Sequence, residues 1–331
     1  MALMSASNTD TPPAAADLPR EGGARPRRPR RPIGRSSGSR PRTSRWVEAS
    51  MVLPALVVFV GLLVVPVGYA VYYSFTDYNG FPTQTPEIVG FDNYVRLFES
   101  ADVRGSMVVT AIVAVAGSMV INAAALGLAL LLWRTTRFTA FARVVMFYPH
   151  VLSLIVVGFL WSAILGPQGA VNSLLESVGS SPLPFLSDET WALATLILVI
   201  AWAQFGVQLL IYLAGLQAVP AELLEASRMD GANRWQTFRH VTWPALAPSV
   251  TVALITSMIS LIKTYDVVVS LTGGGPAGST KTFAYQILAV EFPKRQVGLA
   301  SAEAVVLILV AAILAFGVLA LRRRHDQGVQ E

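Results

Sequence analysis

The sequence predicts an all-α integral membrane protein with six membrane-spanning helices, and three observations favour this class. Only 14% of the 331 residues are charged and 53% are hydrophobic, whereas about 25% of the residues in a soluble domain carry a charge. Six stretches of at least 18 residues contain no charged residue, and a helix needs about 20 residues to cross the hydrocarbon core. Lys and Arg residues gather in alternate connecting segments.

The uncharged stretches give the positions of the expected spans. They are Ala49–Thr76, Gly105–Trp133, Val144–Leu175, Thr190–Ala221, His240–Ile262 and Ala304–Leu321. Each is expected to be helical, because backbone groups in lipid must hydrogen-bond within the protein. We therefore expect a transmembrane domain over residues 46–325, between a tail at 1–45 and a short tail at 326–331.

The connecting segments predict the orientation of the chain. If the N-terminal tail is inside, the inner segments hold 19 Lys and Arg residues and the outer segments hold 5. Cytoplasmic segments carry the excess of these residues in membrane proteins. Both termini are therefore expected in the cytoplasm.

The tail at 1–45 has ten arginines against three acidic residues and is rich in Pro, Ser, Ala and Gly. Such a segment buries too little apolar surface to offset its ordering entropy, so we expect it to be disordered. It either serves only to orient the chain or is attracted to anionic lipids, at about 1 kcal/mol per nearby arginine. Nucleic-acid binding is not expected, because no folded binding module accompanies the charge.

The residue types argue against several kinds of site. The chain has no cysteine, which excludes disulfides, cysteine-ligated metals and cysteine nucleophiles. His150, His240 and His325 lie far apart, so no metal site is expected. An intramembrane hydrolase would need a Ser–His pair, two aspartates or a zinc motif, and we find none. A self-sufficient carrier would more often show paired halves with interrupted helices.

The segment at 214–243 has the strongest helix signals outside the spans. Pro220 suits the first position of a helix. Glu222 and Glu225 would lie near the positive end of the helix dipole. Gly231 suits the left-handed conformation that ends a helix.

A second short helix is expected after that glycine. Asn233 and Gln236 have the spacing of a capping box. Trp235, Phe238 and Val241 recur at about one turn and form an apolar stripe. Pro244 is expected to start the fifth span.

The order of residues in this loop resembles a known family signature. The chain reads Glu225-Ala226-Ser227, then Asp230-Gly231-Ala232, and nine residues after Gly231 it reads Val241-Thr242-Trp243-Pro244. This is similar to the EAA signature of binding-protein-dependent ABC importer permeases, with Ser227, Val241 and Trp243 in place of Ala, Ile and Leu. Together with Trp235, Phe238 and the segment 213–217, it resembles the sugar-type branch, which includes the maltose, glycerol-3-phosphate and multiple-sugar permeases. The resemblance runs from about Val52 to Arg324.

The resemblance implies a fold, a role and partners. The fold would be that of type I ABC importer permeases, and the chain would be half of a sugar pathway in a bacterial or archaeal plasma membrane. It would work by alternating access, without enzymatic activity. A second homologous permease, a dimeric ABC ATPase and an extracellular solute-binding protein would complete it, beside membrane lipids and without nucleic acid. The chain would hold no cofactor, since ATP and Mg belong to the ATPase.

The resemblance also assigns a role to the loop at 214–243, which would be the coupling loop that docks on the ATPase. The residues expected to couple are Glu222, Glu225, Ala226, Asp230, Gly231, Ala232, Trp235, Phe238 and Pro244. The alternative for this loop is an amphipathic interfacial segment. The alternative for the chain is a permease for a non-sugar solute.

The segment Leu271–Pro276 (LTGGGP) is a second match to sugar-type permeases. It also resembles a phosphate-binding loop ending at Lys281, but Thr280 stands where that motif needs glycine. We expect either a flexible outer turn near the binding-protein surface or a plain turn.

Polar residues inside the spans predict a solute path. Gln204 and Gln208 lie one turn apart and can bind sugar hydroxyls, with Trp202, Phe205 or Tyr212 available to stack on the apolar sugar face. Further candidates are Asn122, Ser257 and Ser260. The alternative is hydrogen bonding between helices, which contributes about 0.6 kcal/mol per bond.

Three charged residues near the spans complete the set of path candidates. Lys263 and Asp266 are three residues apart and fit one face of the fifth span. Each would cost about 2.5–3.5 kcal/mol at the bilayer centre, so they should pair, face water or lie at the outer boundary. Glu303, near the start of the sixth span, would either face the path or extend to the outer interface.

Overall fold

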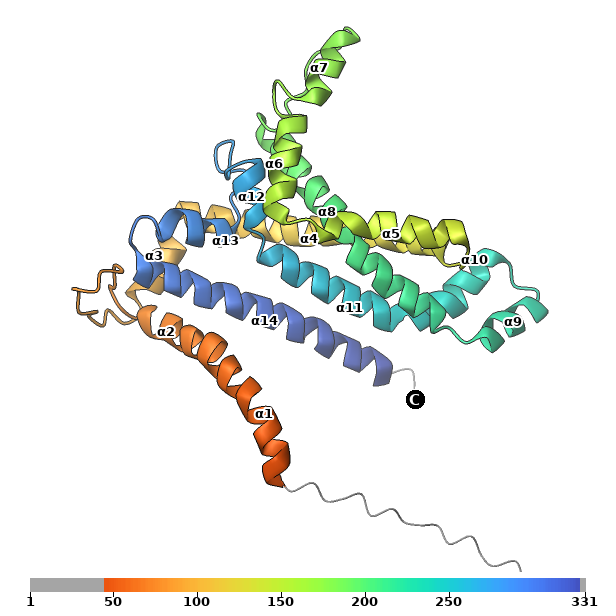
Figure 1. Ribbon diagram of the computed structural model, residues 1–331, viewed down its shortest axis with the longest axis horizontal. Helices are drawn as coiled ribbons and strands as arrows, with labels where there is room; N and C mark the ends of the chain where they lie inside the picture. Colours follow the sequence, from red (N-terminus) through yellow and green to blue (C-terminus); the bar gives the residue numbers. More distant parts are fainter. Residues whose placement is uncertain (1–44, 328–331) are drawn as a thin grey trace, which may run out of the picture. The chain divides into compact units, whose positions relative to one another are not determined.

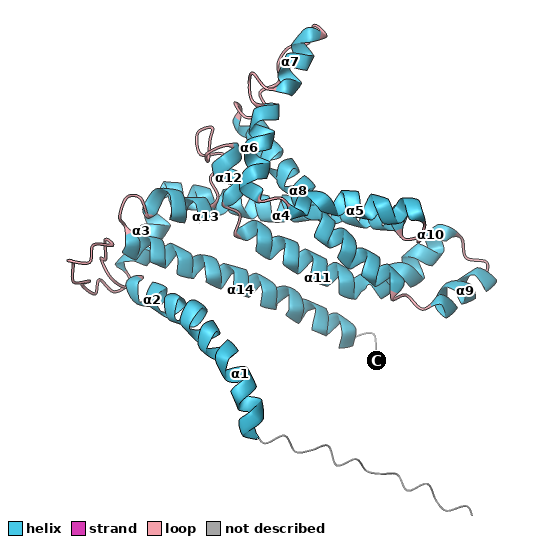
Figure 2. Cartoon of the chain, in the orientation of Figure 1, coloured by secondary structure: helices cyan, strands magenta, loops and turns pink. Residues whose placement is uncertain are grey.

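The computed structural model describes residues 45–327, and its regular elements over that range are helices (Figure 2). Six segments are long and apolar enough to cross a membrane: Ser50–Tyr73, Ala101–Leu132, Leu154–Ser177, Glu189–Gln217, Arg234–Ile262 and Val297–Val318. The predicted all-α, six-span class is confirmed. The tails expected at 1–45 and 326–331 lie outside the described residues, apart from residue 45 and residues 326–327.

The chain divides into two units, residues 1–55 and residues 56–331. Of the first unit the structure describes residues 45–55, which belong to α1 (Arg45–Phe59). The second unit contains η1 (Val60–Val64), α2 (Val65–Tyr73), α3 (Asp92–Glu99), α4 (Ala101–Leu132), α5 (Arg137–Val151), α6 (Leu154–Leu165), α7 (Ala170–Ser177), α8 (Glu189–Gln217), α9 (Ala221–Met229), α10 (Arg234–Thr237), η2 (Phe238–Thr242), α11 (Trp243–Ile262), α12 (Asp266–Leu271), α13 (Phe283–Tyr285), η3 (Gln286–Glu291) and α14 (Val297–Gln327).

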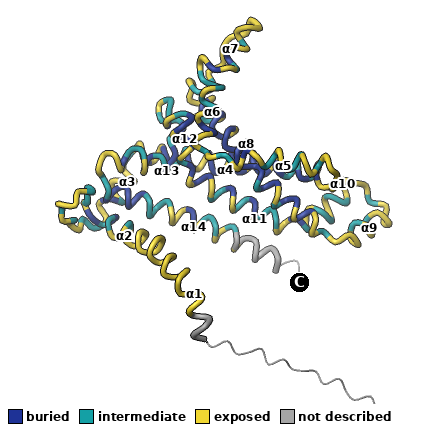
Figure 3. The backbone as a smooth tube through the Cα atoms, in the orientation of Figure 1, coloured by how far each residue is buried: buried dark blue, intermediate teal, exposed yellow. Residues whose placement is uncertain are grey.

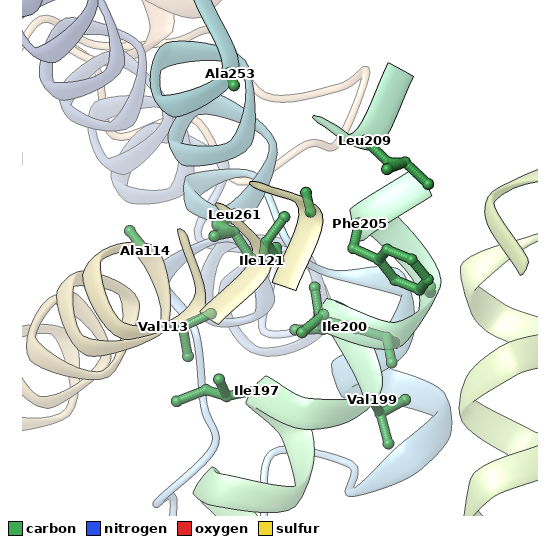
Figure 4. Close-up of a cluster of buried hydrophobic side chains, with 14 of the residues drawn as sticks. Val113, Ala114, Ile121, Ile197, Val199, Ile200, Phe205, Leu209, Ala253 and Leu261 are labelled. Carbon is green, nitrogen blue, oxygen red and sulfur yellow. The ribbon is translucent and has the colours of Figure 1, made fainter. Parts of the chain in front are cut away.

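The core of the second unit lies where α4, α8 and α11 pack together (Figures 1 and 4). Ile121 of α4, Ile200 of α8 and Leu261 of α11 are fully buried there. Figure 3 shows that α8 is buried along most of its length. Close approach of α8 to α5 depends on Gly206, where a Cβ would lie 2.9 Å from the Cα of Phe147. Small residues at such contacts let membrane helices pack closely.

The third expected span is not one continuous helix. α5 ends at Val151, because Leu152 and Ser153 adopt an extended backbone after Pro149. α6 then packs against α12 (Figure 1), and Gly166 ends it before α7 begins. The expectation that Val144–Leu175 is helical throughout is therefore wrong, although Leu154–Ser177 is still long and apolar enough to be a span.

The fifth span begins earlier than expected. The second short helix of the loop does not end before Pro244, because α10, η2 and α11 form one helical segment from Arg234 to Ile262. In η2 the Trp243 N–H reaches the Phe238 carbonyl, five residues back. This wide turn accommodates Pro244, which has no N–H and whose ring would clash with a regular preceding turn.

Two groups of connecting segments gather at opposite ends of the central helices. The coupling loop lies beside the end of α4, where Trp133 and Arg134 face it across a cavity. At the other end, the Gly298 N–H donates to the Tyr78 carbonyl at 2.8 Å, and Lys281 pairs with Asp102 at 3.6 Å. At this end α3 also packs against α14. This grouping agrees with spans that alternate in direction.

Candidate functional site

The first half of the coupling loop is a helix closed by a glycine. α9 is followed by Asp230 and then Gly231, whose φ is +75°. The Gly231 N–H donates to the Arg228 carbonyl at 3.1 Å, and the Ala232 N–H donates to the Ser227 carbonyl at 3.0 Å. These two bonds make a Schellman motif, which requires a left-handed residue at the glycine position. The expected stop at Gly231 is confirmed.

The second half of the loop begins with the expected capping box. Asn233 Oδ1 accepts from the Gln236 N–H at 2.9 Å, and Gln236 Oε1 accepts from the Asn233 N–H at 2.8 Å. The two halves are also joined directly, since the hydroxyls of Ser227 and Thr237 are 3.3 Å apart. These bonds hold α9 and α10 in a fixed arrangement. We call residues 221–237, from the start of α9 to the end of α10, the elbow.

The elbow presents its surface outward. The nine residues expected to couple all lie on it or at its junction with α11, and seven are exposed: Glu222, Glu225, Ala226, Asp230, Gly231, Trp235 and Pro244. Ala232 and Phe238 are half-buried and line a cavity of about 380 Å³ behind the elbow. Met229 is 88% exposed and Trp235 is 65% exposed. Met229 lies outside the spans, and an apolar side chain this exposed there indicates a contact surface.

The elbow continues directly into the fifth span. α10 runs through η2 into α11 without a break, and Leu246, one turn into α11, is fully buried. The sequence could not show this continuity, because it depends on a turn that accommodates Pro244.

Three of the expected path residues form one hydrogen-bonded group. The Tyr212 hydroxyl of α8 donates to Asn122 Oδ1 of α4 at 2.9 Å, and Asn122 Nδ2 donates to Ser257 Oγ of α11 at 2.9 Å. All three side chains are buried. The group ties together the three central helices, which is the structural alternative expected for these residues.

The glutamine pair on α8 keeps unused hydrogen-bonding capacity. Gln204 Oε1 accepts from the Ser260 hydroxyl of α11 at 2.8 Å. Gln204 Nε2 and Gln208 Oε1 are buried without a hydrogen-bond partner. One donor and one acceptor are thus free, one turn apart on α8. Unpaired buried polar atoms are costly and call for an explanation.

Aromatic rings lie near the same part of α8. Trp202 is half-buried and meets Trp161 of α6 edge-on, with the ring centroids 5.5 Å apart. The Trp161 indole N–H is buried and has no partner. Sequence reasoning missed Trp161, because only the folded α6 brings it to Trp202. Phe205 is buried in the core.

Lys263 and Asp266 do not share a helix face, which corrects the sequence expectation. α11 ends at Ile262, Lys263 is its C-cap, and Asp266 begins α12. Just after the end of α11, the Thr264 carbonyl accepts from the Thr282 hydroxyl at 2.7 Å, a contact made by a distant segment. Both charged side chains are exposed, and no ion pair joins them.

Glu303 occupies neither of the two expected positions. It has no exposed surface, so in this conformation it neither lines an open path nor extends to an interface. Both carboxyl oxygens lack a hydrogen-bond partner. Gln286 and Glu291 of η3 are buried beside α14 as well, and the sequence analysis did not single them out.

The turn at Leu271–Pro276 is tied by side chains. The Thr272 and Thr280 hydroxyls are 2.7 Å apart, and the Tyr285 hydroxyl donates to the Gly273 carbonyl at 2.7 Å. The Gly273 and Gly274 φ angles are positive, which explains the glycines. Of the two alternatives expected for this segment, a flexible outer turn and a plain turn, these bonds favour a plain turn held by its own side chains.

Comparison with known proteins shows the family to which this chain belongs. Residues 121–329 match the family described as the inner membrane component of binding-protein-dependent transport systems. The chain belongs to this family. It is accordingly a multi-pass permease component of a transport system and not an enzyme, and it works with a binding protein and partner subunits. The predicted family resemblance is confirmed, and an intramembrane hydrolase is not favoured.

Several relatives match most of the chain. The "Probable starch degradation products transport system permease protein AmyD" of Thermoanaerobacterium thermosulfurigenes is 31% identical over 80% of this chain and 89% of its own length. The diacetylchitobiose uptake permease NgcF of Streptomyces coelicolor is 30% identical, with 91% of each chain covered. The sn-glycerol-3-phosphate permease UgpA of Agrobacterium fabrum is 30% identical over 84% of this chain and 95% of its own.

A solved structure has the same fold. A chain of a bacterial ABC transporter that imports the acidic polysaccharide alginate matches with a TM-score of 0.72 and 22% identity. The match covers 84% of this chain and 96% of that one. The expected importer permease fold is thereby confirmed.

Proposed function

We propose that this chain is the permease subunit of an ATP-driven importer for a sugar or sugar derivative. The names of the relatives support this class of solute, since they describe uptake of starch products, diacetylchitobiose and glycerol-3-phosphate. A bundle of six spans makes half of a pathway, so a second homologous permease forms the other half. An extracellular binding protein delivers the solute, and the surrounding lipids belong to a bacterial or archaeal plasma membrane.

The observation that carries the proposal is the rigid, exposed elbow that continues into α11. It offers Glu222, Glu225, Met229 and Trp235 to a partner, and that partner is a dimeric ABC ATPase which holds ATP and Mg. The excess of Lys and Arg on this side of the spans supports a cytoplasmic position for the elbow and both termini. ATP binding closes the ATPase dimer, and the two elbows approach each other.

The polar residues on α4, α8 and α11 supply the other half of the mechanism. Gln204 and Gln208 are closed off in this conformation, with 6% and 4% of their surfaces exposed. When α11 moves with the elbow, the Ser260–Gln204 contact parts and the free amide groups of α8 face a cavity. Sugar hydroxyls then satisfy them, and Trp202 lies nearby to stack on an apolar sugar face. ATP hydrolysis then returns the helices to the conformation in which Gln204 and Gln208 are closed off.

A substitution at Gly231 tests the coupling role. Gly231→Val forces a β-branched residue into a left-handed backbone, although nothing within 4 Å would clash with its side chain. ATP-dependent uptake by the reconstituted importer should fall at least tenfold, while membrane insertion and basal ATP hydrolysis remain. Gly231→Asn should keep most uptake, because Asn tolerates this conformation.

The chain offers a matched control for this substitution. Gly179, after α7, also has a positive φ, +80°, and open space around it. Gly179→Val carries the same backbone cost away from the elbow and should transport normally. Equal loss of uptake in both valine variants, or none in Gly231→Val, would contradict the proposal.

A further inference from the structure

A buried group of oxygen atoms joins η3 to the start of α14. Gln286 is 1% exposed, Glu291 4% and Glu303 0%. Gln286 Nε2 donates to Glu291 Oε1 at 2.7 Å. The remaining side-chain oxygens, Gln286 Oε1, Glu291 Oε2 and both oxygens of Glu303, are buried without a hydrogen-bond partner. Four acceptors on η3 and on α14, which packs against it, thus have no hydrogen-bond donor.

The charges in this group do not balance. The charged groups that act on the Glu303 carboxyl are Glu291 and Lys294. Lys294 Nζ lies 3.6 Å from Glu291 Oε1, and its side chain is 54% exposed. Two carboxylates and one ammonium leave a net charge of −1. The other charged residues on the helices packed against α14 are Asp92, Arg96 and Glu99 of α3, and all three are exposed.

A partner chain cannot supply the missing charge in this conformation. The four oxygens have no surface contact even in a single chain, so no group outside the chain can reach them. A buried carboxylate without a counter-charge is strongly disfavoured. A proton or a small cation inside the group would supply the missing charge.

We propose that Gln286, Glu291 and Glu303 form a buried binding site for one monovalent positive charge, a proton or a sodium ion. A proton on Glu303 supplies one hydrogen-bond donor and removes the excess charge. A sodium ion supplies the same charge and takes oxygen ligands from all three side chains. In either case the bound charge holds η3, which follows the segment 271–282, against the outer end of α14.

Thermal unfolding of the assembled importer in lipid nanodiscs tests the site. The unfolding midpoint is measured from mildly acidic to mildly alkaline pH, in sodium chloride and in choline chloride. If a proton is bound, the folded state holds more protons than the unfolded one, so the midpoint falls as pH rises. If sodium is bound, the midpoint at alkaline pH rises with sodium but not with choline.

Glu303→Gln is the deciding variant, because its side-chain amide is neutral and carries its own hydrogen-bond donor. The variant therefore needs neither a bound proton nor a bound sodium ion. The pH- or sodium-dependent shift, about 2–4 °C, should disappear in this variant. The exposed Glu99→Gln on α3 is the control and should behave as the parent protein. The infrared C=O band of a protonated carboxyl, present in the parent and lost in Glu303→Gln, identifies the proton as the ligand.

Two results would overturn the site. The first is a dependence of the midpoint on pH and sodium that is the same in Glu303→Gln and in the parent. The second result concerns Glu291→Gln, which is the test variant if Glu303→Gln does not assemble. That variant also removes one negative charge, so retention of the parent's full dependence would refute the proposal.

Discussion

Asn122 of α4 forms hydrogen bonds to both α8 and α11. It accepts from Tyr212 and donates to Ser257, so its loss leaves two buried hydroxyls short of a partner. We expect Asn122→Ala to lower the free energy of unfolding by about 1–2 kcal/mol, measured as a lower midpoint of the assembled importer. Thr256→Ala should have little effect, because Thr256 is exposed and bonds only within α11. Equal effects of the two changes would argue against this role for Asn122.

Gln208 should behave in the opposite way. Its Oε1 has no partner to lose, so Gln208→Leu should leave stability within about 0.5 kcal/mol. If the amide binds the solute, the concentration for half-maximal uptake should rise about tenfold, the value of one good hydrogen bond. Gln217→Leu, at the exposed end of the same helix, is the control. Unchanged uptake in Gln208→Leu would remove it from the solute path.

At the scale of the element, local signals were predictable and distant contacts were not. Asn233, Gln236 and Gly231 act through bonds within a few residues, so their spacing in the sequence was sufficient to place the elbow. The segment after α11 is bonded to Thr282, eighteen residues after Thr264, and no local pattern reveals this contact. The packing of η3, with Gln286 and Glu291, against α14, with Glu303, likewise exists only in the folded chain.

The capping box gives a prediction for the elbow as an element. Asn233→Ala removes the acceptor for the Gln236 N–H, at a cost of about 0.5–2 kcal/mol. Hydrogen exchange of amides in α10 should become roughly fivefold faster, and uptake should fall. Asn233→Asp keeps the acceptor and should preserve both. Unaltered exchange in Asn233→Ala would show that the cap does not hold the elbow.

At the scale of the whole molecule, sequence reasoning recovered the class, the number of spans and the family. These follow from hydropathy, charge asymmetry and the spacing of a loop motif. It did not recover the broken third span, because Pro149 and Gly166 interrupt a stretch that is uniformly uncharged. The roles of the residues inside the spans could not be settled either, since one polar side chain serves packing or transport equally well.

The central claim is that the elbow receives force from a separate ATPase. Because the chain has no cysteine, Met229→Cys, at an 88% exposed position, introduces a single reactive site. Ser180→Cys, exposed in the loop after α7, is the matched control. In the assembled importer, a short thiol-reactive cross-linker should join residue 229 to the ATPase subunit, with a yield that changes on ATP binding. A cross-link from residue 180 alone, or none to the ATPase from residue 229, would contradict the account.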